Sequence, residues 1–126
     1  MKTKILIVDD EHDTVECLDD LLLHKGYNVA SAFSLAEARE QIEKFKPTII
    51  LLDIKLPDGD GVEFLKEIKV NHADIDVIMI TGIADKEIAL SALKNGAADY
   101  ITKPIDLNYL TNSVLAKVVT GFSGDL

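Results

Sequence analysis

Several polar residues that can do phosphate or metal chemistry come directly after short apolar segments of this chain. They are two neighbouring carboxylates, a third carboxylate, a hydroxyl and an amine: Asp9, Asp10, Asp53, Thr81 and Lys103. Carboxylates that are held close together repel one another, so a fold that gathers them needs a compensating cation. A hard ion such as Mg²⁺ takes carboxylate, water and phosphate oxygens as ligands. In such a site Asp53 can attack a phosphoryl group, while the cation, Lys103 and the Thr81 hydroxyl stabilise the phosphate charge.

These residues meet only if the segments before them are strands of one sheet. Residues 49–52 are consecutive aliphatic residues, a pattern typical of a strand buried on both faces of a parallel sheet. The other predicted strands are residues 4–8, 28–33, 76–80 and 99–102. In an open α/β sheet, ligands bind at the edge formed by the carboxyl ends of the strands. On its own, Asp53 is more simply explained as the end of a strand, but the joint placement of the polar residues favours a site.

Helical periodicity fills the stretches between the predicted strands. Asp10 is expected to cap the first helix, and Ser34-x-x-Glu37 and Asp60-x-x-Glu63 are capping boxes for the second and third. Asp85 is expected to cap a fourth helix, and the fifth is predicted from Asp106 to about Val119. The last two helices have aliphatic residues at helical spacing: Ile88, Ala89, Ala92 and Leu93, then Leu107, Leu110, Val114 and Val118.

The strict alternation of strands and helices predicts the fold class. We expect an α/β fold, a flavodoxin-like doubly wound parallel sheet of five strands in the order 2-1-3-4-5 with five helices. Residues 1–119 are predicted to form one domain. Residues 120–126 show no periodicity and are predicted to be a C-terminal tail or the start of a linker. The sequence leaves open whether an output domain follows.

Composition narrows the class of protein. The chain has 126 residues and a formal net charge of −9, which argues against direct nucleic acid binding, because such binding depends on neutralising phosphates. No apolar run approaches the roughly 20 residues of a membrane helix, and the first residues lack a signal-peptide pattern. We therefore expect a cytoplasmic protein without membrane contact. The single cysteine, Cys17, is expected to be a small core or boundary residue of the first helix.

Four sequence motifs give the chain a family resemblance. They are Ile-Leu-Ile-Val-Asp9-Asp10, Leu-Leu-Asp53-Ile-Lys-Leu-Pro57-Asp-Gly-Asp-Gly61, Met-Ile-Thr81-Gly82 and Gly96-Ala-Ala-Asp-Tyr100-Ile-Thr-Lys103-Pro104. Over residues 4–119 the chain resembles the receiver domain of bacterial two-component response regulators. Together these motifs are highly specific for that family.

The resemblance implies a phosphoacceptor. Asp53 would accept a phosphoryl group from a sensor histidine kinase or a phosphotransfer protein, and Lys103 and Thr81 would bind the phosphate. The ligands of Mg²⁺ would be three carboxylates and one backbone carbonyl, from Asp9, Asp10, Asp53 and Lys55. The Lys103–Pro104 peptide bond is expected to be cis, which costs little for a bond before proline. The chain would not be an enzyme for other substrates, because it would catalyse only its own phosphorylation and dephosphorylation.

The same resemblance implies a switch. Phosphorylation adds about −1.5 to −2 charges and three acceptor oxygens, here next to Thr81. Thr81 would move toward the phosphate, and Tyr100 would turn inward into the space that it leaves. This coupling would remodel the surface of the fourth helix, the fifth strand and the fifth helix. The expected recipients of the signal are a phosphorylation-dependent homodimer or an output domain.

Two further residues concern the lifetime of the phosphate. Lys55 and Ile83 are expected to flank the path of the water that hydrolyses the acyl phosphate. Ile83 is apolar and cannot orient a water molecule, so we expect slow self-dephosphorylation. Lys55 could instead contact the phosphate or a partner, and the sequence does not decide between these roles. The alternative function is a receiver-like interaction module that does not cycle phosphate.

Overall fold

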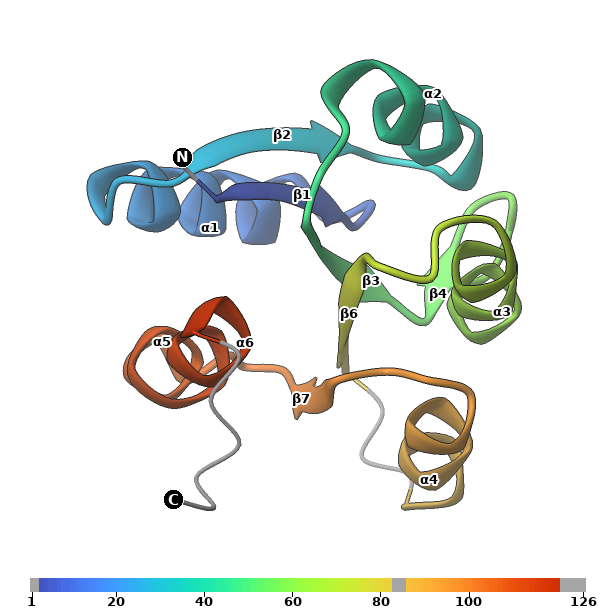
Figure 1. The fold of residues 1–126 in the computed structure, drawn as a ribbon. Helices are drawn as coiled ribbons and strands as arrows, with labels where there is room; N and C mark the ends of the chain where they lie inside the picture. The colour runs from blue at the N-terminus through green and yellow to red at the C-terminus, as the bar shows by residue number, and fades with distance from the viewer. Residues whose placement is uncertain (1–2, 83–85, 121–126) are drawn as a thin grey trace.

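The computed structural model describes residues 3–82 and 86–120 of the chain. Its centre is a five-stranded parallel sheet with the strand order β2-β1-β3-β6-β7 (Figure 1). The strands are β1 (Lys4–Val8), β2 (Asn28–Ala32), β3 (Ile49–Asp53), β6 (Asp76–Thr81) and β7 (Asp99–Thr102). In chain order this arrangement is 2-1-3-4-5, so the predicted flavodoxin-like doubly wound fold is confirmed. The division into a domain and a tail after residue 119 stays a prediction.

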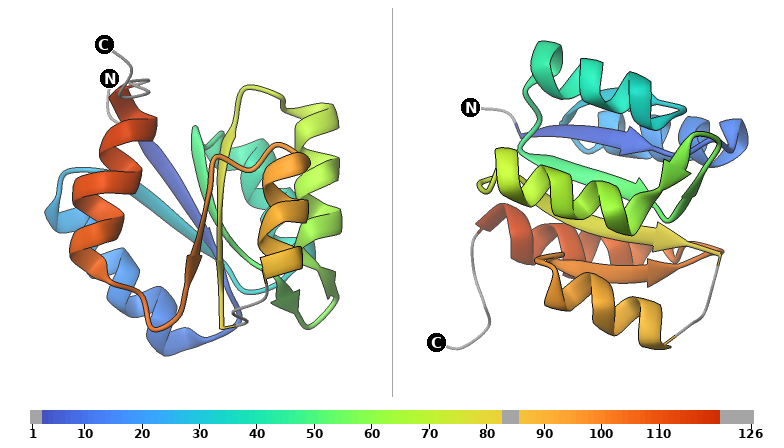
Figure 2. Two further views of the ribbon diagram at one scale, coloured as in Figure 1. Left: turned by 90° about the horizontal axis from the view of Figure 1, so that it is seen from below. Right: turned by 90° about the vertical axis from the view of Figure 1, so that its right-hand side faces the viewer.

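Helices cover both faces of the sheet (Figures 1 and 2). One face carries α1 (His12–His24) and the C-terminal helical segment, and the other carries α2 (Leu35–Phe45), α3 (Gly61–Asn71) and α4 (Lys86–Lys94). The C-terminal helical segment comprises α5 (Leu107–Tyr109), the π-helical η1 (Leu110–Leu115) and α6 (Ala116–Thr120). None of the described helices combines the length and the apolar character that crossing a membrane requires.

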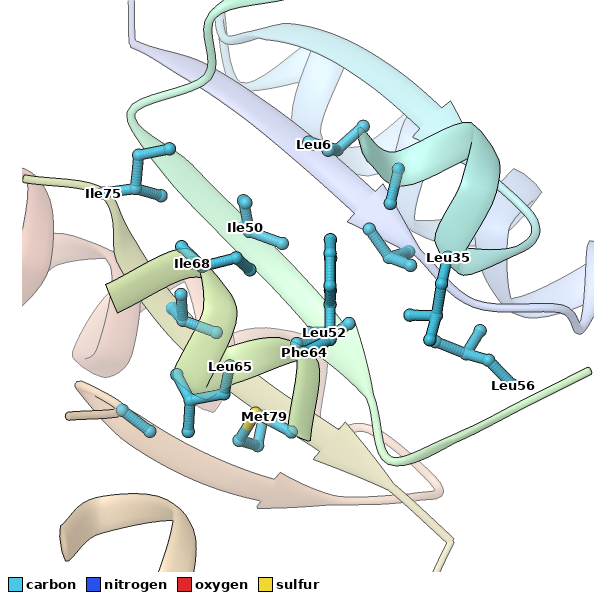
Figure 3. Close-up of a cluster of buried hydrophobic side chains, with 14 of the residues drawn as sticks. Leu6, Leu35, Ile50, Leu52, Leu56, Phe64, Leu65, Ile68, Ile75 and Met79 are labelled. Atoms are coloured by element: carbon cyan, nitrogen blue, oxygen red, sulfur yellow. The ribbon is translucent and has the colours of Figure 1, made fainter. Parts of the chain in front are cut away.

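Alternation along the central strands divides the buried side chains between two cores. In β3, Ile49 and Leu51 face α1 and the C-terminal helical segment, whereas Ile50 and Leu52 face α2 and α3. Figure 3 shows the second of these cores, between the sheet and α3. Every residue of β3 is buried, as its run of aliphatic residues predicts. A strand that is packed on both faces holds its last residue, Asp53, in a defined place at the sheet edge.

Side-chain caps begin α2 and α3. At α2 the Ser34 hydroxyl oxygen accepts a hydrogen bond from the Glu37 N–H at 3.2 Å, and Glu37 Oε1 accepts one from the Phe33 N–H at 3.2 Å. At α3 the Asp60 carboxylate accepts from the Val62 N–H at 2.8 Å. Both helices therefore begin where the capping boxes predict.

Helix α1 differs from the prediction in two details. It begins after Glu11, so Asp10 is not its N-cap, and the Asp9 carboxylate accepts the Glu11 N–H at 2.9 Å just before the helix. Cys17 is exposed, so its expected place in the core or at its boundary is wrong. The buried residues of α1 form one narrow stripe, Val15, Leu18 and Leu22. Cys17 points away from this stripe because it precedes Leu18 by one position.

The helices at the C-terminal end of the chain also differ from the prediction. Helix α4 lies beside the edge strand β7, buries only Ala92, and leaves Leu93 44% exposed. The fifth helix is not a continuous α-helix, because η1 is π-helical. Its wider turn lets both Val114 and Leu115 point into the core. The predicted cap Asp85 lies outside the described residues.

A small hairpin follows β3 where the sequence indicates only a turn. Its strands β4 (Lys55–Leu56) and β5 (Gly59–Asp60) pair in antiparallel register and lead into α3. The chain closes tightly below the hairpin, because the Gly61 N–H donates to the Ile54 carbonyl oxygen at 2.6 Å. In chain order, this hairpin links Asp53 to the start of α3.

Candidate functional site

The carboxyl ends of the parallel strands bring the predicted acidic residues to one edge of the sheet, where the strand arrowheads point in Figure 2. Val8 of β1 lies opposite Leu52 of β3, so the residues that follow them come side by side. One carboxylate oxygen each from Asp9, Asp10 and Asp53 lies within 4.8 Å of the others. Asp9 is 3% exposed and Asp53 is 6% exposed, whereas Asp10 is open to solvent. The structure therefore gathers all three predicted carboxylates.

Lys103 reaches the same carboxylates from the loop that follows β7. Its Nζ lies 2.8 Å from Asp9 Oδ2 and 3.2 Å from Asp53 Oδ2, and its side chain is only 15% exposed. The Lys103 N–H donates to the Thr81 carbonyl oxygen at 2.7 Å, which fixes the start of the loop. The Lys103–Pro104 peptide bond is cis. A single ammonium group thus faces two buried carboxylates.

Glu11 is a residue of this site that the sequence interpretation missed. Its Oε1 pairs with Lys103 Nζ on the outer side of the site, where the Glu11 side chain is 60% exposed. The signal in the sequence is the acidic run Asp9-Asp10-Glu11 directly after an apolar strand. Helical pattern alone places Glu11 at the start of the following helix, where an acidic residue needs no other explanation.

The charges of the site are unbalanced. Burial and, next, the negative charge of Asp9 raise the pKa of Asp53, although Lys103 and the Ile54 N–H, which donates to Asp53 Oδ1 at 2.7 Å, act in the opposite direction. Burial by itself would lower the pKa of Lys103, but the contacts with Asp9 and Glu11 outweigh it and raise this pKa. Lys103 therefore stays an ammonium ion, and the surrounding carboxylates outnumber it.

This set of donors fits a hard divalent cation. Asp9 and Asp53 each engage one oxygen with a backbone N–H and the other with Lys103. Within residues 3–82 and 86–120, the Asp10 carboxylate makes no hydrogen bond or ion pair. Carboxylates at a rim that is open to water suit Mg²⁺, which keeps several waters when it binds to proteins. Lys55, the predicted source of a carbonyl ligand, begins β4 two residues after Asp53, with its side chain exposed.

The two residues of the predicted switch lie on neighbouring strands. Thr81 ends β6, is 1% exposed, and pairs in register with Thr102 of β7. Tyr100 is half-buried and packs against the core between the sheet and α2, α3 and α4. Ile83, predicted to influence dephosphorylation, lies outside the described residues. The structure thus places Thr81 at the edge that carries Asp53, with Tyr100 on the adjoining strand.

A groove of about 570 Å³ adjoins the carboxylates between α1 and the loop after β7. Its lining is mainly apolar but contains charged residues, and includes Glu11, Thr14, Leu18, Lys103, Ile105 and Leu107. Because Lys103 lines the groove and also contacts Asp53, a partner that fills the groove would come next to the acidic site.

Comparison with known proteins gives consistent matches along most of the chain. Residues 5–115 match the family described as the response regulator receiver domain. The transcriptional regulatory protein KdpE of Staphylococcus aureus is 41% identical over 110 residues, which cover 87% of this chain and 47% of KdpE. The response regulator protein PilR of Pseudomonas aeruginosa is 39% identical over 113 residues, which cover 90% of this chain and 25% of PilR.

A solved structure extends the likeness from sequence to fold. The crystal structure of a two-component response regulator from Clostridium difficile matches with a TM-score of 0.90 and 33% identity, over 97% of this chain and 99% of that one. By contrast, the chain spans 47% of KdpE and 25% of PilR, so the likeness to those proteins concerns one part of each. The family match over residues 5–115 includes Asp9, Asp53 and Lys103. The chain therefore belongs to the family of response regulator receiver domains.

Proposed function

We propose that this receiver domain accepts a phosphoryl group on Asp53 from a sensor histidine kinase or a phosphotransfer protein. The observation that carries the proposal is the position of Asp53, a buried carboxylate at the sheet edge beside Asp9, Asp10 and Lys103. A buried nucleophile next to a fixed cation and further acidic groups is the arrangement that phosphoryl transfer needs. Membership of the receiver family supports the same role.

In the transfer, a carboxylate oxygen of Asp53 attacks the phosphorus atom of the donor. The bond between phosphorus and the donor's histidine nitrogen breaks, its electron pair stays on that nitrogen, and an acyl phosphate forms on Asp53. Lys103, which lies 3.2 Å from Asp53 Oδ2, pairs with one phosphate oxygen. The hydroxyl of the buried Thr81 donates to another. Lys103 already contacts Asp53 before the reaction, so it stabilises the developing charge without large rearrangement.

Mg²⁺ is the proposed cofactor. When bound, it supplies positive charge for the phosphate oxygens and lowers the repulsion between them and the acidic site. We assign its protein ligands to the carboxylates of Asp9, Asp10 and Asp53 and to the backbone carbonyl of Lys55. Asp9 keeps one oxygen on the Glu11 N–H, at 2.9 Å, which fixes the orientation of its carboxylate.

The proposed output is a change of the surface formed by α4, β7 and the C-terminal helical segment. The phosphate draws the Thr81 hydroxyl, and Tyr100, now half-buried, turns further inward. Leu90 and Leu93 of α4 are 57% and 44% exposed and lie on the surface that would change. The phosphate must favour one of two existing states by a few kcal/mol to act as a switch. A second copy of the chain or an output domain is the proposed recipient.

The wider role follows from the same chemistry. The chain catalyses only its own phosphorylation and dephosphorylation and acts as a signalling phosphoacceptor in the cytoplasm. We also propose slow self-dephosphorylation, because the apolar side chain of Ile83 has no group that could orient an attacking water. Lys55 is the second residue assigned to the path of that water. The groove between α1 and the loop after β7 offers the phosphodonor a docking surface next to Asp53. The acidic chain does not bind nucleic acid directly.

Phosphorylation by a small donor tests the proposal directly. The protein is incubated with Mg²⁺ and acetyl phosphate, and its intact mass is measured. We expect wild type to gain the mass of one phosphoryl group and Asp53→Asn to gain none. Asp74→Asn changes an exposed carboxylate outside the site and should gain phosphate like wild type. An unaltered mass in all three proteins would instead support the interaction module that does not cycle phosphate.

A further inference from the structure

One side chain of the hairpin that follows Asp53 is hydrogen-bonded to α2, a helix that is distant in the sequence. Asp58 connects β4 to β5, and its two carboxylate oxygens accept hydrogen bonds from the first turn of α2. Asp58 Oδ1 accepts from the Leu35 N–H at 2.8 Å, and Asp58 Oδ2 accepts from the Ala36 N–H at 3.0 Å. These two N–H groups have no partner inside their own helix. They lower the pKa of Asp58, which therefore stays ionised at neutral pH.

The base of the hairpin is fastened as well, to the backbone of the phosphoacceptor strand. The Gly61 N–H donates to the Ile54 carbonyl oxygen at 2.6 Å. A Cβ atom at Gly61 would lie 2.0 Å from the Asp53 carbonyl oxygen, so only glycine allows this approach. The base of the hairpin is thus set by the backbone beside Asp53, whatever holds its tip.

Apolar contacts alone do not fix the tip. Leu56 of β4 and Leu35 of α2 belong to the same buried core (Figure 3). A Cβ atom at Gly59 would lie 2.6 Å from Leu35 Cδ1, so the tip passes directly over that side chain. Such packing is non-directional and permits sliding. The paired hydrogen bonds of Asp58 are directional and add a fixed position.

We infer that Asp58 is a positioning residue for the metal site, because it holds the hairpin, and with it the backbone of Lys55, against the first turn of α2. The inference rests on the proposed function, in which the Lys55 carbonyl is a ligand of Mg²⁺. Lys55 lies between the two fixed points, two residues after Asp53 and three before Asp58. Mg²⁺ demands near-ideal octahedral geometry, so it is sensitive to small displacements of a ligand. Groups that orient metal ligands typically contribute tenfold or more to metal affinity.

The test compares two variants. Each of them removes a side chain that accepts hydrogen bonds from N–H groups in the first turn of α2. Asp58→Ala removes the acceptors of the Leu35 and Ala36 N–H groups and also releases the hairpin. The matched control Ser34→Ala removes the acceptor of the Glu37 N–H, at 3.2 Å, but leaves both hydrogen bonds to Asp58 in place. Mg²⁺ is titrated into each protein and followed by the amide NMR spectrum. We expect about a tenfold higher dissociation constant for Asp58→Ala and an unchanged one for Ser34→Ala.

A second measurement reports on the hairpin without Mg²⁺. Amide hydrogen exchange along the paired strands β4 and β5 should be faster in Asp58→Ala than in Ser34→Ala, since only the first variant frees the tip. Asp58→Asn keeps one carbonyl oxygen that can accept from α2, so it should give intermediate values in both measurements. This variant also serves if Asp58→Ala fails to fold.

The outcomes separate this inference from the proposed function. If wild type binds Mg²⁺ and the Asp58 variants bind it as tightly, the positioning role is wrong while the phosphoacceptor proposal stands. Equal losses of Mg²⁺ affinity in Asp58→Ala and Ser34→Ala would also overturn the positioning role. They would show that weakening the start of α2, and not release of the hairpin, lowers the affinity. If wild type binds no Mg²⁺, both proposals fail together.

Discussion

Two groups of charged side chains in this molecule each contain a basic side chain in contact with a carboxylate, but one group is exposed and the other is buried. On the surface, Arg39 of α2 contacts Glu67 of α3 through two hydrogen bonds of 2.8 and 3.0 Å, with the side chains 52% and 40% exposed. At the sheet edge, Lys103 contacts Asp53 and Asp9 at 3.2 and 2.8 Å, and the side chains of Lys103, Asp53 and Asp9 are 15%, 8% and 4% exposed. The first group is neutral and the second has more acids than bases.

The two carboxylates shift their pKa in opposite directions although each has a cationic partner. The hydrogen bonds from Arg39 lower the pKa of Glu67. Burial and the neighbouring Asp9 raise the pKa of Asp53, despite Lys103. The difference teaches that an ion pair by itself does not mark a site. A buried, unbalanced set of charges is costly to the fold, and such sets are kept where they serve function.

The largest effect is expected from removing the only cation of the buried group. Lys103→Ala leaves Asp9 and Asp53 ionised and uncompensated, so we expect a loss of about 3 kcal/mol in the free energy of unfolding without Mg²⁺. Phosphorylation by acetyl phosphate should slow by about 100-fold or more, because the phosphate loses a fixed positive partner. Denaturant titrations and the phosphorylation time course measure both. Lys66→Ala, which removes an exposed lysine, should resemble wild type in both.

Mg²⁺ should have the next largest effect, because it supplies the positive charge that the buried group lacks. At about 100 times its dissociation constant it should raise the free energy of unfolding by about 2.7 kcal/mol. Denaturant titrations with and without Mg²⁺ measure the shift, with NaCl at equal ionic strength as the control. Asp10→Asn should weaken the shift. A rise of the same size in NaCl would show that general screening, and not a site, is responsible.

Asp53→Asn should stabilise the metal-free protein at pH 7 by on the order of 1 kcal/mol, since it removes a buried like charge beside Asp9. The sign follows from the raised pKa. Folded Asp53 binds its proton more tightly than unfolded Asp53, so its contribution to stability is lost as the pH rises from the ordinary aspartate pKa of 3.8 through the raised pKa of the folded state. The advantage of the variant should therefore shrink as the pH falls through this window. Unfolding free energies at several pH values measure it, and a variant less stable than wild type at pH 7 would contradict it.

The smallest effect, of opposite sign, is expected at the surface pair. Glu67→Gln replaces a carboxylate by an amide as Asp53→Asn does, but in a solvated pair, so it should cost only about 0.2–0.5 kcal/mol at pH 7. Because the folded pKa of Glu67 is lowered, the contribution of the pair is present above the ordinary glutamate pKa of 4.5 and is lost as the pH falls through the folded pKa. The same unfolding measurements should show this, and the phosphorylation rate should match wild type. A stabilised Glu67→Gln would remove the contrast between the two groups.

Much of the fold was predictable because its signals are local. The aliphatic residues of β1, β3 and β6 are adjacent in the sequence, and the polar residues of the site follow them directly. The capping box at Ser34 likewise acts within one helical turn. The rule that the ends of parallel strands share one edge then brings Asp9, Asp53 and Lys103 together.

Other features were missed because they depend on contacts between distant segments. Cys17 and Leu93 are exposed because the neighbouring elements cover only a narrow stripe of α1 and of α4. The π-helical turn of η1 follows from how Val114 and Leu115 both fit the core, and helical periodicity does not reveal it. The hairpin after Asp53 was predicted only as a turn, since its pairing is too short to leave a strand pattern.

The sequence by itself determined which segments become buried strands. It also determined which acidic residues, which hydroxyl and which amine follow these strands. Both depend on hydrophobic pattern and residue type, which are properties of neighbouring positions. Only the tertiary structure decided which charges meet. Glu11 and Lys103 are 92 positions apart, and Asp58 is 23 positions from Leu35. Such partners are chosen by the packing of whole elements. Burial also comes from packing. It decides whether a contact between opposite charges is a balanced surface pair or part of a buried acidic group that needs a further cation.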